Sequence, residues 1–238
     1  MSDVLQPSGI QASRFGSHWV WTDGSLDPQA ALPVLLQADG DPGLTKIGNR
    51  GRGSAWRLTV NGEPAVLRHY QRGGLMARMN RDRYLWQGAL QTRAYREFDL
   101  MLRLSDRGLP VPRPIAARAS RHGLSYRAAI LTRYVEHRGA LSDLPHQAAW
   151  HAAGAAIARL HAAGVWHADL NVHNILIDAD NRAWLIDFDR AQEGVSDRSR
   201  LQDNLSRLLR SVRKVCPELI EPLWPVLLDG YADTQKIP

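Results

Sequence analysis

Short apolar runs separated by turn residues fill much of the first half of the chain. These runs, residues 44–48, 55–60, 64–70 and 128–135, predict strands with at least one buried face. Asn61-Gly62 stands between the second and third runs, and both residue types accept the positive φ angles of a tight hairpin turn. Residues 111–114 predict an extended linker. The first half is therefore expected to form a small sheet.

Helical spacing of apolar residues occurs once in this half of the chain and is the main pattern of the second half. Tyr95, Phe98 and Leu102 share one helical face, and Gly108 and Pro110 end the pattern. The predicted helices span residues 92–107, 145–163, 199–214 and 217–230. Two short strands, at 175–177 and 183–186, are expected to be joined by a polar turn at 178–182. The second half is therefore expected to be mostly helical.

The order of these elements predicts an α+β fold with two lobes. Residues 1–43 are rich in Gly, Pro, Asp and Ser and predict an N-terminal extension with one short helix. Residues 44–135 are expected to form a β-rich lobe, and residues 136–238 a larger helical lobe. A ligand is expected to bind between the lobes.

Composition places the chain among ordinary globular proteins. Hydrophobic residues make up 44% of its 238 residues and charged residues 23%, which argues against disorder and fibrous repeats. The single cysteine, Cys216, forms no internal disulfide, which favours a reducing compartment. No apolar run reaches the roughly 18 residues of a membrane span, and the first 30 residues lack the pattern of a signal peptide. Secretion and membrane spanning are not expected.

Positive charge is concentrated in the middle of the chain. Residues 46–138 hold nineteen basic and six acidic residues, and only three lysines occur in the whole sequence. Guanidinium groups bind phosphate and carboxylate oxygens in a bidentate manner, so an anionic partner is one explanation. A general preference for arginine is the other.

One polar cluster carries candidate chemistry. His-Ala-Asp-Leu-Asn-Val-His-Asn occupies residues 167–174, and Asp187-Phe188-Asp189 follows after a predicted hairpin. A loop, a hairpin and a second loop would bring Asp169, Asn174 and Asp187 together. Phosphoryl transfer needs one carboxylate to orient the attacking hydroxyl, and a carboxylate with an amide oxygen to hold magnesium.

Spacing and order in this cluster resemble the catalytic and metal loops of the protein-kinase-like superfamily. The resemblance implies that Asp169 is the catalytic base, that Asn174 and Asp187 bind Mg²⁺, and that His167 supports the loop. A chance cluster of surface polar residues is the alternative.

The upstream half adds weaker support for the same superfamily. Gly48, Gly51, Gly53 and Ser54 lie between two predicted strands and are expected to cover nucleotide phosphates, although a plain hairpin loop would look the same. The resemblance places Arg68 where the superfamily has a strand lysine, and Glu97 where it has the partner carboxylate. If Arg68 is only a strand-edge charge, Lys46 is the alternative phosphate contact. For Glu97, the alternative is an ordinary helix-surface acid.

Departures from the superfamily pattern bear on the substrate. Asp189 replaces the glycine of the metal loop, and no Ala-Pro-Glu follows, which disfavours a peptide substrate. Asp203 on the next predicted helix is expected either to anchor the catalytic loop or to lie on a solvated face.

Two phrases make the resemblance more specific: Arg-His-Tyr-Gln-Arg-Gly-Gly at residues 68–74 and Asn-Leu-Ser-Arg-Leu-Leu-Arg-Ser at residues 204–211. They resemble the 3-deoxy-D-manno-octulosonic acid (Kdo) kinases of the lipopolysaccharide kinase family. The resemblance implies ATP- and Mg²⁺-dependent phosphorylation of the 4-hydroxyl of Kdo on a lipid A precursor, at the cytoplasmic face of the inner membrane.

The basic segment agrees with such an anionic acceptor and membrane surface. Four arginines beside the glycine pair are the candidates for this contact: Arg72, Arg78, Arg81 and Arg83. A solvated basic face is the simpler explanation. No nucleic acid is expected as a partner. The rival functions are another small-molecule kinase, of the heptose or aminoglycoside type, and a non-catalytic pseudokinase that binds anionic ligands.

Overall fold

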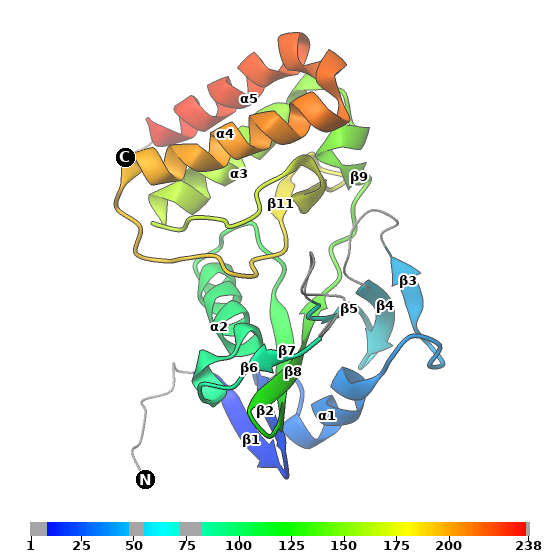
Figure 1. Ribbon diagram of the computed structural model, residues 1–238. Coiled ribbons are helices and arrows are strands. Elements are labelled where there is room, and N and C mark those ends of the chain that lie inside the picture. Colours follow the sequence, from blue (N-terminus) through cyan, green and yellow to red (C-terminus); the bar gives the residue numbers. More distant parts are fainter. Residues whose placement is uncertain (1–8, 48–54, 72–81, 237–238) are drawn as a thin grey trace. The chain divides into compact units, whose positions relative to one another are not determined.

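The computed structural model describes residues 9–47, 55–71 and 82–236. The chain divides into two compact units, Met1–Leu102 with Arg113–Tyr134 and Arg103–Pro112 with Val135–Pro238. Figure 1 shows strands concentrated in the first unit and helices in the second. The expected α+β class is confirmed.

The first unit is built on one antiparallel sheet with the order β1-β2-β7-β8-β5-β4-β3, and β6 pairs with the start of β8. Its strands are β1 (Gln11–Phe15), β2 (His18–Thr22), β3 (Thr45–Ile47), β4 (Ala55–Val60), β5 (Glu63–His69), β6 (Tyr84–Leu85), β7 (Pro114–His122) and β8 (Ser125–Arg133). The helices α1 (Pro28–Leu36) and most of α2 (Arg93–Asp106) complete this unit.

The predicted hairpin around Asn61-Gly62 is confirmed. Val60 pairs with Glu63, which leaves a two-residue loop between β4 and β5. Asn61 has φ 51° and Gly62 has φ 83°. Positive φ at both loop positions matches the right-handed twist of the strands, which is why this dipeptide favours such a turn.

Two parts of the sheet differ from the expectation. Residues 1–43 contribute β1, β2 and α1 to the same unit as the other strands, since β2 pairs with β7. The expected linker at 111–114 ends in Pro114, the first residue of the nine-residue strand β7, which the pattern of apolar residues does not predict. Alanine and arginine fill much of β7, so its strand conformation depends on its two neighbouring strands more than on residue propensity.

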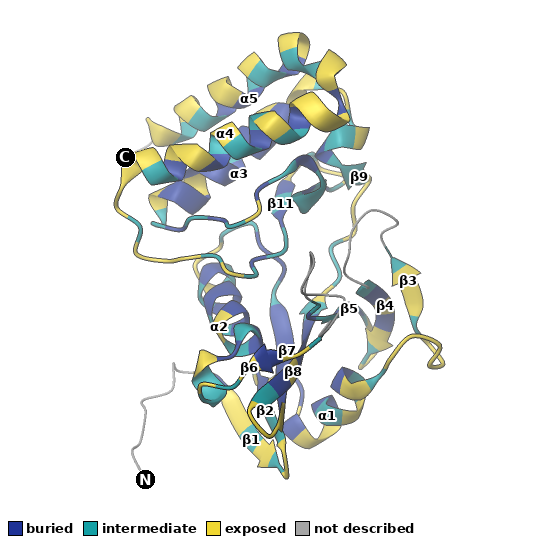
Figure 2. Cartoon of the chain, viewed as in Figure 1, coloured by how far each residue is buried: buried dark blue, intermediate teal, exposed yellow. Residues whose placement is uncertain are grey.

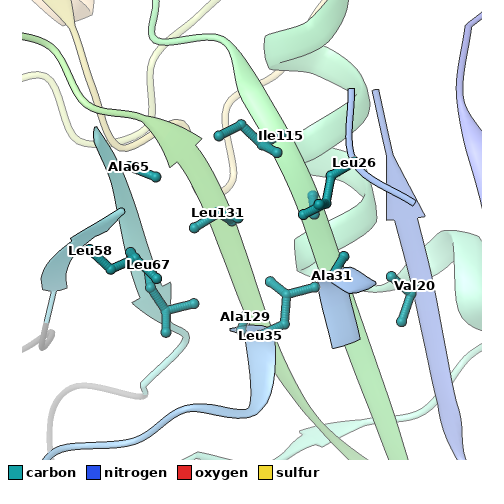
Figure 3. Packing of buried hydrophobic residues seen from close by; sticks show 11 residues of the cluster. Val20, Leu26, Ala31, Leu35, Leu58, Ala65, Leu67, Ile115, Ala129 and Leu131 are labelled. Atoms are coloured by element: carbon teal, nitrogen blue, oxygen red, sulfur yellow. The ribbon is translucent and has the colours of Figure 1, made fainter. Parts of the chain in front are cut away.

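Apolar side chains from α1 and five strands form a core on one face of this sheet (Figure 3). Leu35 of α1, Leu67 of β5 and Leu131 of β8 are fully buried in it. Burying a leucine side chain contributes about 1.5–3 kcal/mol. Asp27 caps α1 at its N-terminus by accepting a hydrogen bond from the Gln29 amide.

A buried arginine closes the other end of α1. Arg118 of β7 donates from Nε to the Leu35 carbonyl oxygen at 3.1 Å and also donates to Ser120 Oγ. Burial lowers the pKa of Arg118 to about 10, so the guanidinium stays charged at neutral pH. A cation is favoured at a helix C-terminus, where carbonyl groups concentrate negative potential.

Within the described residues, the second unit carries the end of α2, three complete α-helices and a small sheet with the order β11-β10-β9. Its elements are β9 (Gly139–Ala140), α3 (Gln147–Ala162), β10 (Ile175–Ile177), β11 (Ala183–Leu185), α4 (Arg198–Val215) and α5 (Ile220–Gln235). Short 3₁₀ turns precede α3, β10 and α5, at Leu141–Asp143, Val172–Asn174 and Pro217–Leu219. Figure 2 shows that α3, α4 and α5 keep exposed positions on their outer faces. Among the described residues, no helix combines the length and apolarity that crossing a bilayer requires.

Two glycines let α3 and α5 approach closely. A Cβ added at Gly154 of α3 would lie 1.9 Å from the Leu227 carbonyl oxygen, and one at Gly230 of α5 would lie 2.1 Å from the His151 carbonyl oxygen. Both contacts involve backbone atoms, so neither helix can yield by rotating a side chain. The helix pair therefore depends on glycine at both positions.

Gly154→Ala is expected to lower the free energy of unfolding by about 3 kcal/mol, because overpacking against backbone outweighs the gain in helix propensity of about 1 kcal/mol. Urea denaturation followed by circular dichroism measures the change. Arg159→Ala, at an exposed position of the same helix, serves as the control and should change stability by less than about 0.5 kcal/mol. A Gly154→Ala protein as stable as the wild type would contradict the close packing.

Candidate active site

The loop at residues 167–174 follows α3, and its polar residues alternate with buried apolar residues that hold it to the rest of the unit. Leu170 and Val172 are fully buried, whereas Asp169 is exposed. The Trp166 amide donates to the Gln192 carbonyl oxygen at 2.8 Å, and the Gln192 amide donates back at 2.9 Å. The start of the loop is thereby fixed to the segment that follows residues 187–189, so the two predicted motifs lie in one structural assembly.

His167 joins the two motifs through both nitrogens of its buried ring. Nε2 lies 3.0 Å from the Ile186 carbonyl oxygen, and Nδ1 lies 3.2 Å from the Asp169 amide nitrogen. A carbonyl only accepts and an amide N–H only donates, so the imidazole is neutral, with its proton on Nε2. Burial lowers the pKa of His167, while the carboxylates of Asp187 and Asp169 act in the opposite direction. Both carboxylates therefore lie close enough to influence the same imidazole.

Phe188 fixes the other side of this ring. Its side chain is buried, and the two ring centroids lie 4.9 Å apart with the planes inclined at 67°. Edge-to-face aromatic contacts of this kind favour one orientation of both rings. The predicted supporting role of His167 thus has a geometric basis.

Asn174 is held by the loop that it ends. Its Nδ2 donates to the Asp169 carbonyl oxygen at 2.9 Å, and the Asn171 Nδ2 donates to the same oxygen at 3.0 Å. The Ile186 amide donates to the Asn174 carbonyl oxygen at 3.0 Å. Because its amide nitrogen is engaged in the loop, the side chain of Asn174 offers its Oδ1 atom as a ligand.

Asp187 follows directly after this backbone contact and has the left-handed φ of 64°. Aspartate tolerates this region better than most residues, yet a non-glycine residue there usually costs of order 1 kcal/mol or more. The hydrogen bonds of Ile186 and the buried ring of Phe188 restrain the backbone on both sides. The fold therefore fixes the direction in which the Asp187 carboxylate leaves the chain.

A residue other than the expected one anchors the loop from α4. Asp203 is exposed, so the solvated-face alternative holds for it. The neighbouring Asn204 is fully buried, accepts from the His167 amide at 3.0 Å and donates to the His167 carbonyl oxygen at 2.6 Å. Its Oδ1 also lies 3.2 Å from Nε2 of His161, whose Nδ1 lies 2.9 Å from the Tyr231 hydroxyl.

Arg207 and Ser211 extend this anchor along α4. Arg207 Nη1 lies 3.1 Å from Asp169 Oδ1, and the Val172 amide donates to Ser211 Oγ at 3.3 Å. Positions 204, 207 and 211 follow the i, i+3, i+7 spacing of one helix face. In the sequence, Arg207 stands out only as part of the phrase at residues 204–211, and no spacing links it to Asp169.

In the first unit, Arg68 and Glu97 form an ion pair. Glu97 is almost completely buried on α2 and accepts a second hydrogen bond, at 2.5 Å, from the Tyr70 hydroxyl. The Arg68 guanidinium lies 5.0 Å from the centre of the Tyr70 ring. Arg68 of β5 is therefore paired with a helix of the same unit, and Glu97 is not an ordinary surface acid. Lys46 of β3 is exposed.

The predicted glycine-rich segment lies outside the described residues, and so do Gly48, Gly51, Gly53 and Ser54. The flanking residues are described: Ile47 of β3 pairs with Ala55 of β4. The segment thus connects two adjacent antiparallel strands. Arg72, Arg78 and Arg81 also lie outside the described residues, whereas Arg83 is exposed.

The donor set in the second unit suits a hard divalent cation. Within the described part of the chain, no group of three or more His, Cys, Asp and Glu side chains could hold a metal ion. Asp187 and Asn174 provide a carboxylate and an amide oxygen. Mg²⁺ usually takes one or two carboxylates and completes its shell with waters and substrate phosphates, so few protein ligands are needed.

Comparison with known proteins identifies the family. The profile of the lipopolysaccharide kinase (Kdo/WaaP) family matches residues 46–231. A protein of Stenotrophomonas maltophilia (strain K279a) named 3-deoxy-D-manno-octulosonic acid kinase is 49% identical over 173 residues, which cover 71% of this chain and 70% of that protein.

Proteins with the same name from two other organisms agree. The one from Xanthomonas euvesicatoria pv. vesicatoria (strain 85-10) is 49% identical over 169 residues, covering 69% of this chain and 68% of that protein. The one from Xylella fastidiosa (strain M23) is 47% identical over 173 residues, covering 71% and 70% respectively. The chain belongs to the lipopolysaccharide kinase (Kdo/WaaP) family and is a phosphotransferase that acts on a hydroxyl group.

Proposed function

We propose that this protein transfers the γ-phosphoryl group of ATP to the 4-hydroxyl of Kdo on a lipid A precursor, in lipopolysaccharide core biosynthesis. Relatives 47–49% identical that carry the name Kdo kinase support this substrate over a heptose or an aminoglycoside. The observation that carries the proposal is the hydrogen-bonded link through His167 between Asp169 and the Ile186-Asp187 peptide. This link suits phosphoryl transfer because it connects Asp169, the proposed base, to Asp187, a proposed metal ligand.

Asp187 and Asn174 are the proposed holders of Mg²⁺. When bound, the ion neutralises charge on the nucleotide phosphates. Asp169 is the proposed base: its exposed carboxylate orients the sugar hydroxyl and accepts its proton as the oxygen attacks the γ-phosphorus. Arg207 is the proposed positioning residue, since its contact with Oδ1 leaves Oδ2 of Asp169 to face the hydroxyl.

Arg68 is proposed to bind nucleotide phosphates from the first unit. One arm of its guanidinium faces Glu97, and the planar fork has further N–H groups that suit phosphate oxygens. Glu97 and Tyr70 would then set the direction of that fork. The glycine-rich segment at 48–54, with Gly48, Gly51, Gly53 and Ser54, is proposed to cover the same phosphates.

The two units are proposed to be the nucleotide-binding and catalytic lobes of a kinase-like fold. The presence of Asp169, Asn174 and Asp187 argues against a non-catalytic pseudokinase, and Arg68, paired with Glu97, is proposed to supply the positive charge of the usual lysine. We further propose peripheral attachment to the cytoplasmic face of the inner membrane, where the anionic glycolipid acceptor would lie. Nucleic acid is not expected as a partner.

Asp169→Asn is expected to reduce turnover by about 10²–10⁴-fold, because the amide accepts no proton, while ATP affinity changes by less than about twofold. Mass spectrometry of purified Kdo-lipid after incubation with ATP and magnesium counts the added phosphate. Asp203→Asn, at an exposed position of α4, is the matched control and should keep wild-type turnover. Wild-type turnover in Asp169→Asn would reject this residue as the base.

Arg207→Ala is expected to lower kcat by about tenfold or more, because Asp169 loses the contact that orients it, with little change in the KM for ATP. Arg207→Lys should recover part of kcat, since a lysine keeps the charge but not the geometry. Steady-state kinetics at saturating acceptor separates the two constants. Arg210→Ala, exposed on the same helix, is the control. A rise in KM alone, or no recovery with lysine, would refute the positioning role.

A further inference from the structure

Two turns of the first unit's sheet lie side by side and expose an unusual set of side chains. The β1–β2 and β7–β8 turns approach at one end of the sheet, where the Arg121 amide donates to the Ser17 carbonyl oxygen at 2.9 Å (Figure 1). The Trp86 amide, just after β6, donates to the Leu124 carbonyl oxygen at 2.9 Å. We name this region the turn surface; it consists of Arg14, Trp19, Leu85, Trp86, Arg121 and Leu124.

The apolar part of the turn surface is exposed to an unusual degree. Leu124 is 80% exposed and Leu85 is 63% exposed, the two highest values among the large hydrophobic residues of the described part. They lie close together, because Leu85 pairs with Ser125, the neighbour of Leu124. Single exposed leucines are ordinary, but two such residues in one place favour a surface that binds something.

Tryptophan and arginine side chains of the turn surface stack on one another. The rings of Trp19 and Trp86 have centroids 4.6 Å apart. Arg14 lies 4.6 Å from the centre of the Trp19 ring, and Arg121 lies 5.5 Å from that of Trp86. Tryptophan prefers the interface between lipid headgroups and hydrocarbon, and arginine at that depth reaches lipid phosphates.

The charge of the surrounding turns also favours a lipid surface as the partner. Residues 14–19, 83–86 and 121–127 contain four arginines and no acidic residue. The adjacent Asp82 pairs with Arg127, with 2.7 Å between Nε and Oδ2. Arg83, one of the four arginines that the sequence pointed to for membrane contact, stands directly before β6 and is exposed. Positive charge around exposed leucine and tryptophan complements an anionic bilayer.

We propose that the turn surface docks this protein on an anionic membrane, with Leu85 and Leu124 inserted between headgroups and the arginines on lipid phosphates. The proposal rests on the proposed function in one respect: an enzyme that phosphorylates a glycolipid acts at a bilayer. The membrane-binding residues are separate from the proposed active site, because every residue of the turn surface belongs to the first unit and none is assigned to phosphoryl transfer.

Flotation with vesicles that contain neither ATP nor Kdo-lipid tests the docking independently of the reaction. The wild-type protein should float with phosphatidylglycerol/phosphatidylethanolamine vesicles and not with phosphatidylcholine vesicles. The double variant Leu85→Ser/Leu124→Ser should reduce the partition coefficient by about tenfold or more. Arg14→Ala/Arg121→Ala should reduce it by about fivefold per arginine removed, and added salt should weaken binding of the wild type.

Matched variants control for general changes in apolar and charged surface. Leu36→Ser/Leu228→Ser removes two other exposed leucines, and Arg213→Ala/Lys214→Ala removes two exposed charges of α4. Both should float like the wild type. Circular dichroism melts check that every variant is folded.

Three results would overturn the docking proposal. The first is that the wild type fails to float with anionic vesicles. The second is that Leu85→Ser/Leu124→Ser floats as well as the wild type. The third is that light scattering finds a wild-type dimer that Leu85→Ser/Leu124→Ser converts to a monomer, which would assign the surface to a second copy. If vesicles bind as expected but Kdo-lipid gains no phosphate, the proposed function fails and the docking stands.

Discussion

The candidate active site depends on one buried imidazole. His167 uses both ring nitrogens, one toward the Asp169 amide and the other toward the Ile186 carbonyl. Leaving a buried donor or acceptor without its partner costs about 1–3 kcal/mol, so the two segments resist moving apart. Asn204 then bonds both backbone groups of His167 itself. The geometry of this single residue therefore links the loop that carries Asp169 to the segment that carries Asp187.

The helix α4 acts as the rigid support behind this loop. Its face presents Asn204, Arg207 and Ser211 to three successive points of the 167–174 segment. Side chains on a helix are more precisely placed than those on a loop, because neighbouring turns restrict their rotamers. In the first unit, strand β5 and helix α2 perform the equivalent task for Arg68 and Glu97, with Tyr70 as the third partner.

Sequence reasoning succeeded where the signal is local. Asn61-Gly62 specifies its own turn, and the amphipathic helices carry their periodicity in the chain itself. It failed where distant neighbours decide: β7 is alanine-rich and becomes a strand between β2 and β8. The residue that anchors the loop from α4 is Asn204 and not its neighbour Asp203. Consecutive helix residues point about 100° apart, so an error of one position places the side chain on a different face. The contact of Arg207 with Asp169 spans 38 residues and has no local signal.

Asp187 and Asn174 are proposed to direct oxygen atoms at one divalent ion. Anomalous diffraction from crystals grown with Mn²⁺ and a non-hydrolysable ATP analogue tests it most directly. We expect a manganese peak within about 2.3 Å of an Asp187 carboxylate oxygen and of Asn174 Oδ1, with phosphate oxygens as further ligands. A manganese ion bound to the nucleotide but remote from both side chains would contradict it.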